Sequence, residues 1–157
     1  MNKRTAFAIT ALTAALALAP MTAAQAAKKP LVNFSGLGSY TVSGGIASAT
    51  GTVSGAPFDG SFTAALEPRD GTLPDPGVCE AGHASIRIDG SRGRYAVLIG
   101  DGSVCGKYVD ATNVVTQAFT GTYSVAATSD RKLLGGDGWM EVRLSNGGRS
   151  TVSAYDS

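Results

Sequence analysis

Apolar and polar residues alternate with a period of two along much of the chain, and the clearest example spans residues 32–43. One set of alternate positions holds only apolar residues or glycine: Val32, Phe34, Gly36, Gly38, Tyr40 and Val42. The intervening residues are polar apart from Leu37, so the segment predicts a strand with one packed and one solvated face. Gly36 and Gly38 inside so long a strand predict a bend, as a strand needs where it wraps a small barrel.

Further segments rich in Val, Ile, Thr, Phe and Tyr follow, separated by clusters of turn-forming residues, and none has a sustained helical period. This pattern predicts many short strands joined by turns. The strands that we expect cover residues 46–53, 61–66, 84–88, 94–99, 114–126, 139–144 and 149–155. About eight strands suffice to close an antiparallel β-barrel with a filled interior, or to form a two-sheet β-sandwich. We expect the all-β barrel and keep the sandwich as the alternative.

A turn at residues 90–93 sets the register of one predicted hairpin. If all four residues form the turn, Ile86 lies opposite Val97, and apolar residues meet along one side of the hairpin. The same register places Cys79 one residue out of line with Cys105, so a single β-bulge is expected to bring the two together.

A loop at residues 146–148 sets the register of a second hairpin. With three residues in the loop, Trp139 lies opposite Tyr155 on one face, and Met140 lies opposite Ala154 on the other. A two-residue Asn-Gly turn would mix these inner and outer sets, so we predict the three-residue loop.

The first 26 residues predict the compartment of the protein. A short basic stretch at residues 2–4 precedes an uncharged Ala/Leu-rich run at 6–19, and Ala-Gln-Ala at 24–26 matches a cleavage pattern. We expect a secretory signal peptide over residues 1–26 and a single β domain over 27–157. The apolar run is shorter than the ~20 residues of a membrane-spanning helix, and no cysteine follows it directly. The mature chain is therefore expected to be secreted, with no membrane anchor.

The mature chain holds two cysteines, Cys79 and Cys105, and an exported protein meets an oxidising compartment. We expect one disulfide between them, which should stabilise the fold by roughly 3 to 4 kcal/mol. A zinc site is the alternative use of paired cysteines, but it needs three or four ligands, and His83 is the only histidine. We therefore expect no metal site.

The charge of the mature chain excludes one class of partner. Loss of the leader leaves one more acidic than basic residue, and basic residues occur together only at 28–29 and 131–132. A nucleic-acid partner is therefore not expected, because such proteins carry a basic face. The sequence also contains no cofactor-binding loop, so no cofactor is expected.

Two regions are candidates for catalysis. His83 must serve as the base of any nucleophilic site, and Asp101 lies near it in the predicted hairpin. No Gly-x-Ser-x-Gly motif is present to supply a nucleophile. The Pro/Gly-rich segment 67–82 carries four carboxylates: Glu67, Asp70, Asp75 and Glu80. Paired carboxylates there could serve a glycosidase or bind Ca²⁺, whereas a solvated acidic loop is the simpler interpretation. We assign no catalytic residue.

Two further sets of residues are candidates for binding. The predicted hairpin places Trp139 and Tyr155 on its outer face with Glu141 and Arg143, a combination suited to contacting a carbohydrate or a protein. A cross-strand pair that only stabilises the sheet is the alternative. On the inner face of segment 114–126, Gln117 lies among apolar residues, including Phe119 and Tyr123, and its amide needs a hydrogen-bond partner or a ligand. These three residues are candidates for contacting a ligand inside the barrel.

The tracts at residues 119–125 (Phe-Thr-Gly-Thr-Tyr-Ser-Val) and 131–138 (Arg-Lys-Leu-Leu-Gly-Gly-Asp-Gly) give a strand, Gly-rich turn, strand rhythm. This rhythm resembles that of the dirigent and allene oxide cyclase-like β-barrels, and of small secreted proteins of high-GC actinobacteria. The resemblance covers about the last third of the chain and implies a barrel. It implies no activity, because no catalytic residue of that family matches a position here.

These observations favour a secreted, non-catalytic extracellular binding or interaction module for a carbohydrate or a protein. The competing expectation is a small secreted hydrolase or cyclase with its site near His83 or the acidic segment 67–82.

Overall fold

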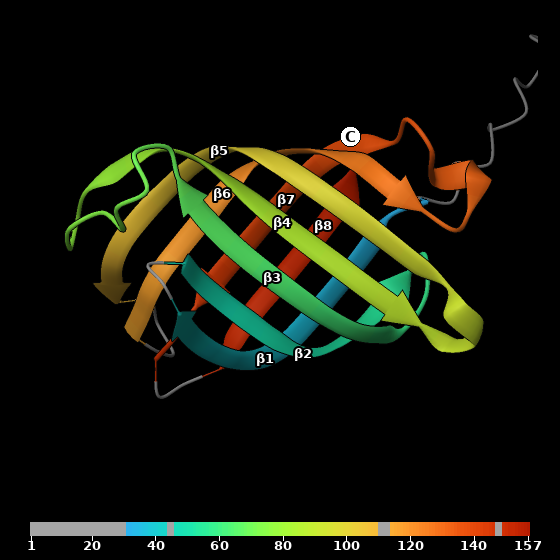
Figure 1. Ribbon diagram of the computed structural model, residues 1–157, viewed down its shortest axis with the longest axis horizontal. Coiled ribbons are helices and arrows are strands. Elements are labelled where there is room, and N and C mark those ends of the chain that lie inside the picture. The colour runs from blue at the N-terminus through green and yellow to red at the C-terminus, as the bar shows by residue number, and fades with distance from the viewer. Residues whose placement is uncertain (1–30, 44–45, 110–113, 147–148) are drawn as a thin grey trace, which may run out of the picture.

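The computed structural model describes residues 31–43, 46–109, 114–146 and 149–157, and the predicted leader lies outside them. The described chain forms eight strands and two short 3₁₀ turns (Figure 1). The strands are β1 (Asn33–Ser43), β2 (Ile46–Ala56), β3 (Gly60–Pro68), β4 (Cys79–Gly90), β5 (Tyr95–Val109), β6 (Val114–Thr128), β7 (Asp137–Leu144) and β8 (Ser150–Asp156). The turns are η1 (Ser91–Gly93) and η2 (Arg131–Leu133).

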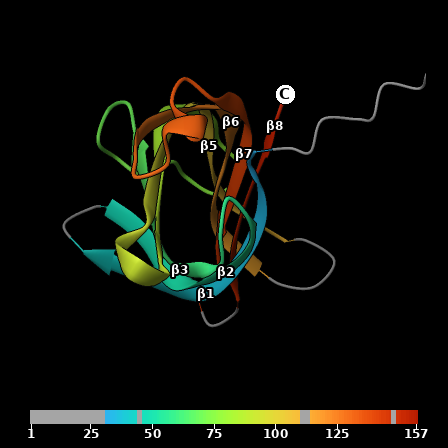
Figure 2. The same cartoon turned by 90° about the vertical axis from the view of Figure 1, so that its right-hand side faces the viewer.

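The eight strands of the described chain form a closed antiparallel barrel in sequence order, with β1 paired to β8. Figure 2 shows the wall as a closed ring. The predicted barrel is confirmed, and the sandwich is excluded. β4 and β5 are longer than predicted, because β4 begins at Cys79 and β5 continues to Val109 through several glycines.

Alternation along each strand sends the apolar residues inward. The largest fully buried side chains in the described chain are Phe119, Leu66, Ile86, Ile88, Leu98, Leu133, Met140 and Leu144. These side chains fill the centre of the ring, so the interior is a packed core of the kind that small barrels contain.

Glycines let parts of the wall lie close to the core. Gly36 faces inward on β1, and a Cβ there would lie 2.8 Å from Val152 Cγ2 and 2.9 Å from the Thr52 carbonyl oxygen. A Cβ at Gly38 would lie 2.8 Å from the ring of Phe62. Because no side chain holds β1 away from the interior here, the strand can approach the core closely.

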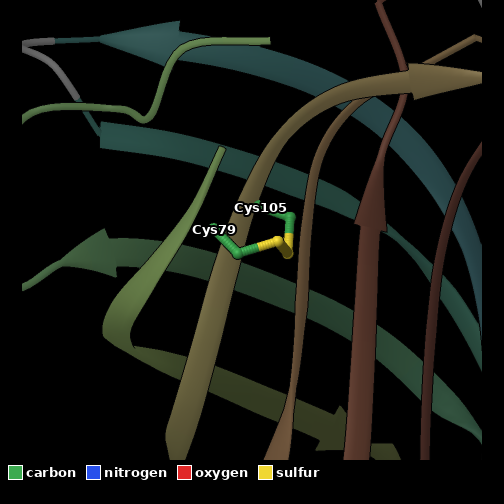
Figure 3. Close-up of a disulfide and its surroundings, with 2 residues drawn as sticks. All are labelled: Cys79 and Cys105. Carbon is green, nitrogen blue, oxygen red and sulfur yellow. A yellow bond between two sulfur atoms is a disulfide. The ribbon is translucent and has the colours of Figure 1, made fainter. Parts of the chain in front are cut away.

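The disulfide links β4 to β5, with Cys79 directly opposite Cys105 and 4.0 Å between their Cα atoms (Figure 3). The predicted pairing of the cysteines is confirmed, but the predicted hairpin register is wrong by one residue. Ile86 lies opposite Leu98, not Val97, and no bulge is needed to align the cysteines.

The difference arises in the turn of that hairpin. Gly90 N donates to Arg94 O at 2.8 Å, so the loop is the three-residue η1 rather than the predicted four residues. Within η1, Arg92 has φ 60° and Gly93 has φ 71°, both in the left-handed region. Glycine enters that region readily, but arginine rarely does, so the sequence gives little sign of the tighter turn.

The predicted register of the C-terminal hairpin is confirmed. Trp139 lies opposite Tyr155, and Met140 lies opposite Ala154. Residues 147–148 of the predicted loop lie outside the described residues.

The seam between β1 and β8 is reinforced by Asp156. Its carboxylate accepts hydrogen bonds from the backbone N–H groups of Leu31 and Val32, and from the hydroxyl of Tyr123 at 3.2 Å. Burial raises the pKa of the Tyr123 hydroxyl, and the negative charge of Asp156 raises this pKa further. The hydroxyl therefore stays protonated and donates to the carboxylate.

Candidate functional site on the outer wall

Two aromatic side chains stand together on the outer wall of the barrel. Trp139 on β7 and Tyr155 on β8 are direct cross-strand neighbours, and they are 41% and 50% exposed. No loop of the described chain buries the indole. Half-exposed rings of this kind keep a face available for a ligand, so the candidate contact surface remains geometrically possible.

An ion pair follows the aromatic pair along β7. Arg143 Nε donates a hydrogen bond to the carboxylate of Glu141, and both side chains are partly exposed. Across the β7–β8 ladder, Glu141 lies opposite Ser153, and Arg143 lies opposite Thr151. The predicted set of four residues therefore shares one face of a single hairpin.

A hollow of about 380 Å³ lies beside this face, over β8, β1 and β2. Five of its eight lining residues are serine or threonine: Ser35, Thr52, Ser54, Thr151 and Ser153, with Gly36, Leu37 and Val152 between them. The hollow lies where Gly36 lets β1 approach the core. The sequence places these hydroxyl-bearing residues on the solvated face but gives no sign that the face is concave.

A second hollow, of about 400 Å³, lies on the other side of the ion pair. Its lining residues are Gly77, Cys79, Cys105, Gly106, Tyr108, Ala118, Thr120, Glu141 and Arg143. Glu141 and Arg143 thus line the second hollow, while their cross-strand partners Ser153 and Thr151 line the first. The ion pair stands between two neighbouring hollows of the same wall.

His83 and Asp101 form a separate surface pair. They are direct cross-strand partners on β4 and β5, with 2.6 Å between His83 Nδ1 and Asp101 Oδ1. Both side chains are largely exposed, and neither residue lines either hollow. The geometry can orient an imidazole, and it places the pair on the open wall, outside both hollows.

The four carboxylates of segment 67–82 do not gather. Glu67 lies on β3 opposite His83, and Asp75 is exposed on the loop between β3 and β4. Asp70 and Glu80 interact with each other, and one carboxylate oxygen of Glu80 is buried without a hydrogen-bond partner. Partial burial of the carboxylate raises the pKa of Glu80, and the charge of Asp70 and a hydrogen bond to Asp70 raise this pKa further.

We expect the stability of the protein to fall as pH rises through the pKa of Glu80. The folded state favours the protonated carboxyl group of Glu80, because its pKa is higher there than in the unfolded chain. The protonated group therefore contributes fully to the stability of the fold below the unfolded-state pKa, and this contribution is lost as pH rises through the folded-state pKa. The variant Glu80→Gln keeps a neutral side chain, so its gain in unfolding free energy over the wild type should be larger at about pH 7 than at about pH 4. Urea unfolding at both pH values measures this difference, and Asp70→Asn should reduce it. An equal effect of Glu80→Gln at both pH values would contradict the prediction.

The candidate lumen residues all lie on β6 and point into the barrel. Gln117, Phe119 and Tyr123 are buried, and Gln117 Oε1 has no hydrogen-bond partner. Gln117 lies opposite Gly106, against which the loop carbonyls of Pro74 and Asp75 pack closely. The amide therefore lies at the end of the barrel that this loop covers. The hollows described above lie elsewhere, on the outer surface.

No three His, Cys, Asp or Glu side chains of the described residues come together as a set that could hold a metal ion. Within the same residues, no helix has the length and apolar character needed to cross a membrane. Comparisons of the chain with protein-family models, with curated proteins and with solved structures find no match.

Proposed function

We propose that this protein is a secreted, non-catalytic module that binds carbohydrate on the outer wall of its barrel. The proposal rests on one observation: two half-exposed aromatic rings are direct cross-strand neighbours, and Tyr155 lies two residues along β8 from Ser153, which lines a hollow composed mainly of serine and threonine. Aromatic rings pack against the C–H faces of sugar rings, while hydroxyl, carboxylate and guanidinium groups hydrogen-bond to sugar hydroxyls. The disulfide supports an oxidising, extracellular setting.

The composition of the hollow favours a carbohydrate over a protein partner. Serine is depleted in protein–protein interfaces, and serine and threonine are under-represented among the residues that dominate their binding energy. Here these two residue types form most of the lining of the first hollow. Their hydroxyl groups suit a ligand that is itself covered with hydroxyls, and Leu37 and the threonine methyls suit its apolar faces.

The positions of the ionisable pairs favour binding over hydrolysis. A hydrolase needs its acid, base or nucleophile beside a bound substrate. The His83–Asp101 pair and the Asp70–Glu80 pair both lie outside the two hollows. A ligand seated in the second hollow would therefore contact Glu141 and Arg143, and a ligand in the first hollow would contact serine and threonine hydroxyls, rather than these pairs.

Replacing Trp139 with Ala should weaken carbohydrate binding at least about tenfold, because the indole supplies a stacking surface. The cost in stability should be about 1 kcal/mol, since the side chain is half-exposed and contributes one cross-strand pair. A glycan-array screen of residues 27–157 identifies the ligand, and titration calorimetry with the strongest hit measures the change. Ile99→Ala is the matched control, because Ile99 is similarly exposed, at 44%, on the outer face, but lies on β5, two strands away from Trp139 on β7.

Loss of affinity in Trp139→Ala but not in Ile99→Ala would support the proposal. If no glycan binds, or if Trp139→Ala binds as well as the wild type, the proposed function is wrong. Capture of a protein partner through the same residues would instead assign the surface to protein recognition.

A further inference from the structure

Six lining residues of each hollow belong to the same two rows of cross-strand partners on the outer wall. In one row, Thr120, Glu141, Ser153, Ser35 and Ser54 are successive cross-strand partners from β6 to β2. In the other row, the successive partners are Cys79, Cys105, Ala118, Arg143, Thr151, Leu37 and Thr52. The two hollows thus form one strip that runs across the strands, interrupted only by the Glu141–Arg143 pair.

The length of the strip bears on the size of its ligand. From β5 to β2 the strip crosses β6, β7, β8 and β1, a path of about 24 Å at roughly 4.8 Å between neighbouring strands. A chain of several linked sugar rings is needed to span this path. A single sugar would contact one hollow only. Trp139 and Tyr155 lie one row from the middle of the strip, where they can pack against the central rings.

The charge along the strip bears on the chemistry of its ligand. None of the described residues that line the first hollow is charged. In the second hollow, the carboxylate of Glu141 and the guanidinium of Arg143 are bonded to each other, so their charges cancel locally. A charged chain would meet no net opposite charge along this path, so it would gain no electrostatic attraction. An uncharged chain needs no such attraction.

From this strip we infer that the ligand is an extended, uncharged glycan chain that lies across the strands and occupies both hollows at once. The inference rests on the proposed function and adds the length, direction and charge of the ligand. Binding should consequently strengthen with chain length until the chain spans both hollows and then level off. It should also change little with salt, because surface charge pairs do not hold the ligand.

The test measures affinity for oligosaccharides of increasing length, prepared from an uncharged polysaccharide that binds the wild-type protein. Two variants each fill one hollow: Ser54→Trp on β2 and Thr120→Trp on β6. Each should weaken binding of the longest chain at least about tenfold. Thr63→Trp places the same side chain at an exposed position of β3 outside both hollows, and it should bind as the wild type does.

The possible outcomes distinguish a failure of the extended-chain inference from a failure of carbohydrate binding itself. If a monosaccharide or disaccharide binds as tightly as the longest chain, carbohydrate binding stands and the extended-chain inference is wrong. The same conclusion follows if only one of Ser54→Trp and Thr120→Trp weakens binding while the far-ultraviolet spectra of both match the wild type. Tighter binding of charged glycans that is lost in salt would overturn the uncharged assignment. If no glycan of any length binds, both the proposed function and this inference fall.

Discussion

Replacing Phe119 with Ala should lower the free energy of unfolding by about 3 to 5 kcal/mol, the largest loss that we expect from a single substitution. Phe119 is fully buried on β6, and its ring lies over two glycines of the wall. A Cβ at Gly100 would lie 3.1 Å from Phe119 Cε1, and a Cβ at Gly121 would lie 2.7 Å from Cζ. Because neither glycine has a side chain to move into the vacated space, the cavity should remain largely open. Urea unfolding of residues 27–157 measures the loss.

Leu134→Ala is the control for this prediction, because Leu134 is 59% exposed in the connection between β6 and β7. Its unfolding free energy should stay within about 0.5 kcal/mol of the wild type. A loss below about 2 kcal/mol for Phe119→Ala would show that the wall collapses inward to fill the cavity.

Removal of the disulfide should cost roughly 3 to 4 kcal/mol in the chain-entropy model. The bond links residues 26 apart in the sequence, so its loss frees a long loop in the unfolded chain. Replacing both Cys79 and Cys105 with serine, followed by urea unfolding, measures the effect. Wild-type protein unfolded in the presence of a reductant should lose a similar amount. A loss below about 1 kcal/mol in both experiments would mean that the paired strands already hold this loop closed without the bond.

The two hairpins illustrate where the sequence determines register and where it does not. From Trp139 to Tyr155, apolar and polar residues alternate, and a three-residue loop keeps the inward-facing residues opposite each other and the outward-facing residues opposite each other. The structure has the register that this loop length predicts. In the β4–β5 hairpin, a shift of one residue still pairs apolar residues with each other, so alternation cannot decide between the registers. The left-handed conformation of Arg92 decides it, and an arginine gives no local signal of that conformation.

β4 and β5 are longer than the sequence predicts, because a glycine in this chain can either mark a turn or lie inside a strand. Gly100, Gly102 and Gly106 resemble turn residues in the sequence, yet all three lie inside β5. At Gly102, a Cβ would lie 2.1 Å from the Thr120 carbonyl oxygen, so the strands approach more closely than a larger residue would allow. Such close approach depends on the curvature of the finished barrel, which no local pattern encodes.

The candidate site was predictable in composition but not in shape. The sequence places Trp139, Glu141, Arg143 and Tyr155 on one outer face, and the structure brings all four together there. It gives no indication of the hollows, because their depth depends on how closely strands distant in the sequence approach the core. His83 and Asp101 are also adjacent, as expected, but they lie apart from both hollows.

The closed strand order has a consequence for how the protein reaches its folded state. Seven of the eight ladders in the described barrel join strands that follow each other in the chain, so they can form early as successive hairpins. The β1–β8 ladder alone brings distant ends together, and the hydrogen bond from Leu31 N–H to the Asp156 carboxylate, beside the end of that ladder, spans 125 residues. Until that ladder forms, the sheet exposes the edges of β1 and β8, whose free N–H and C=O groups can pair with another molecule. Formation of the β1–β8 ladder is therefore the step that removes the open edges of the sheet.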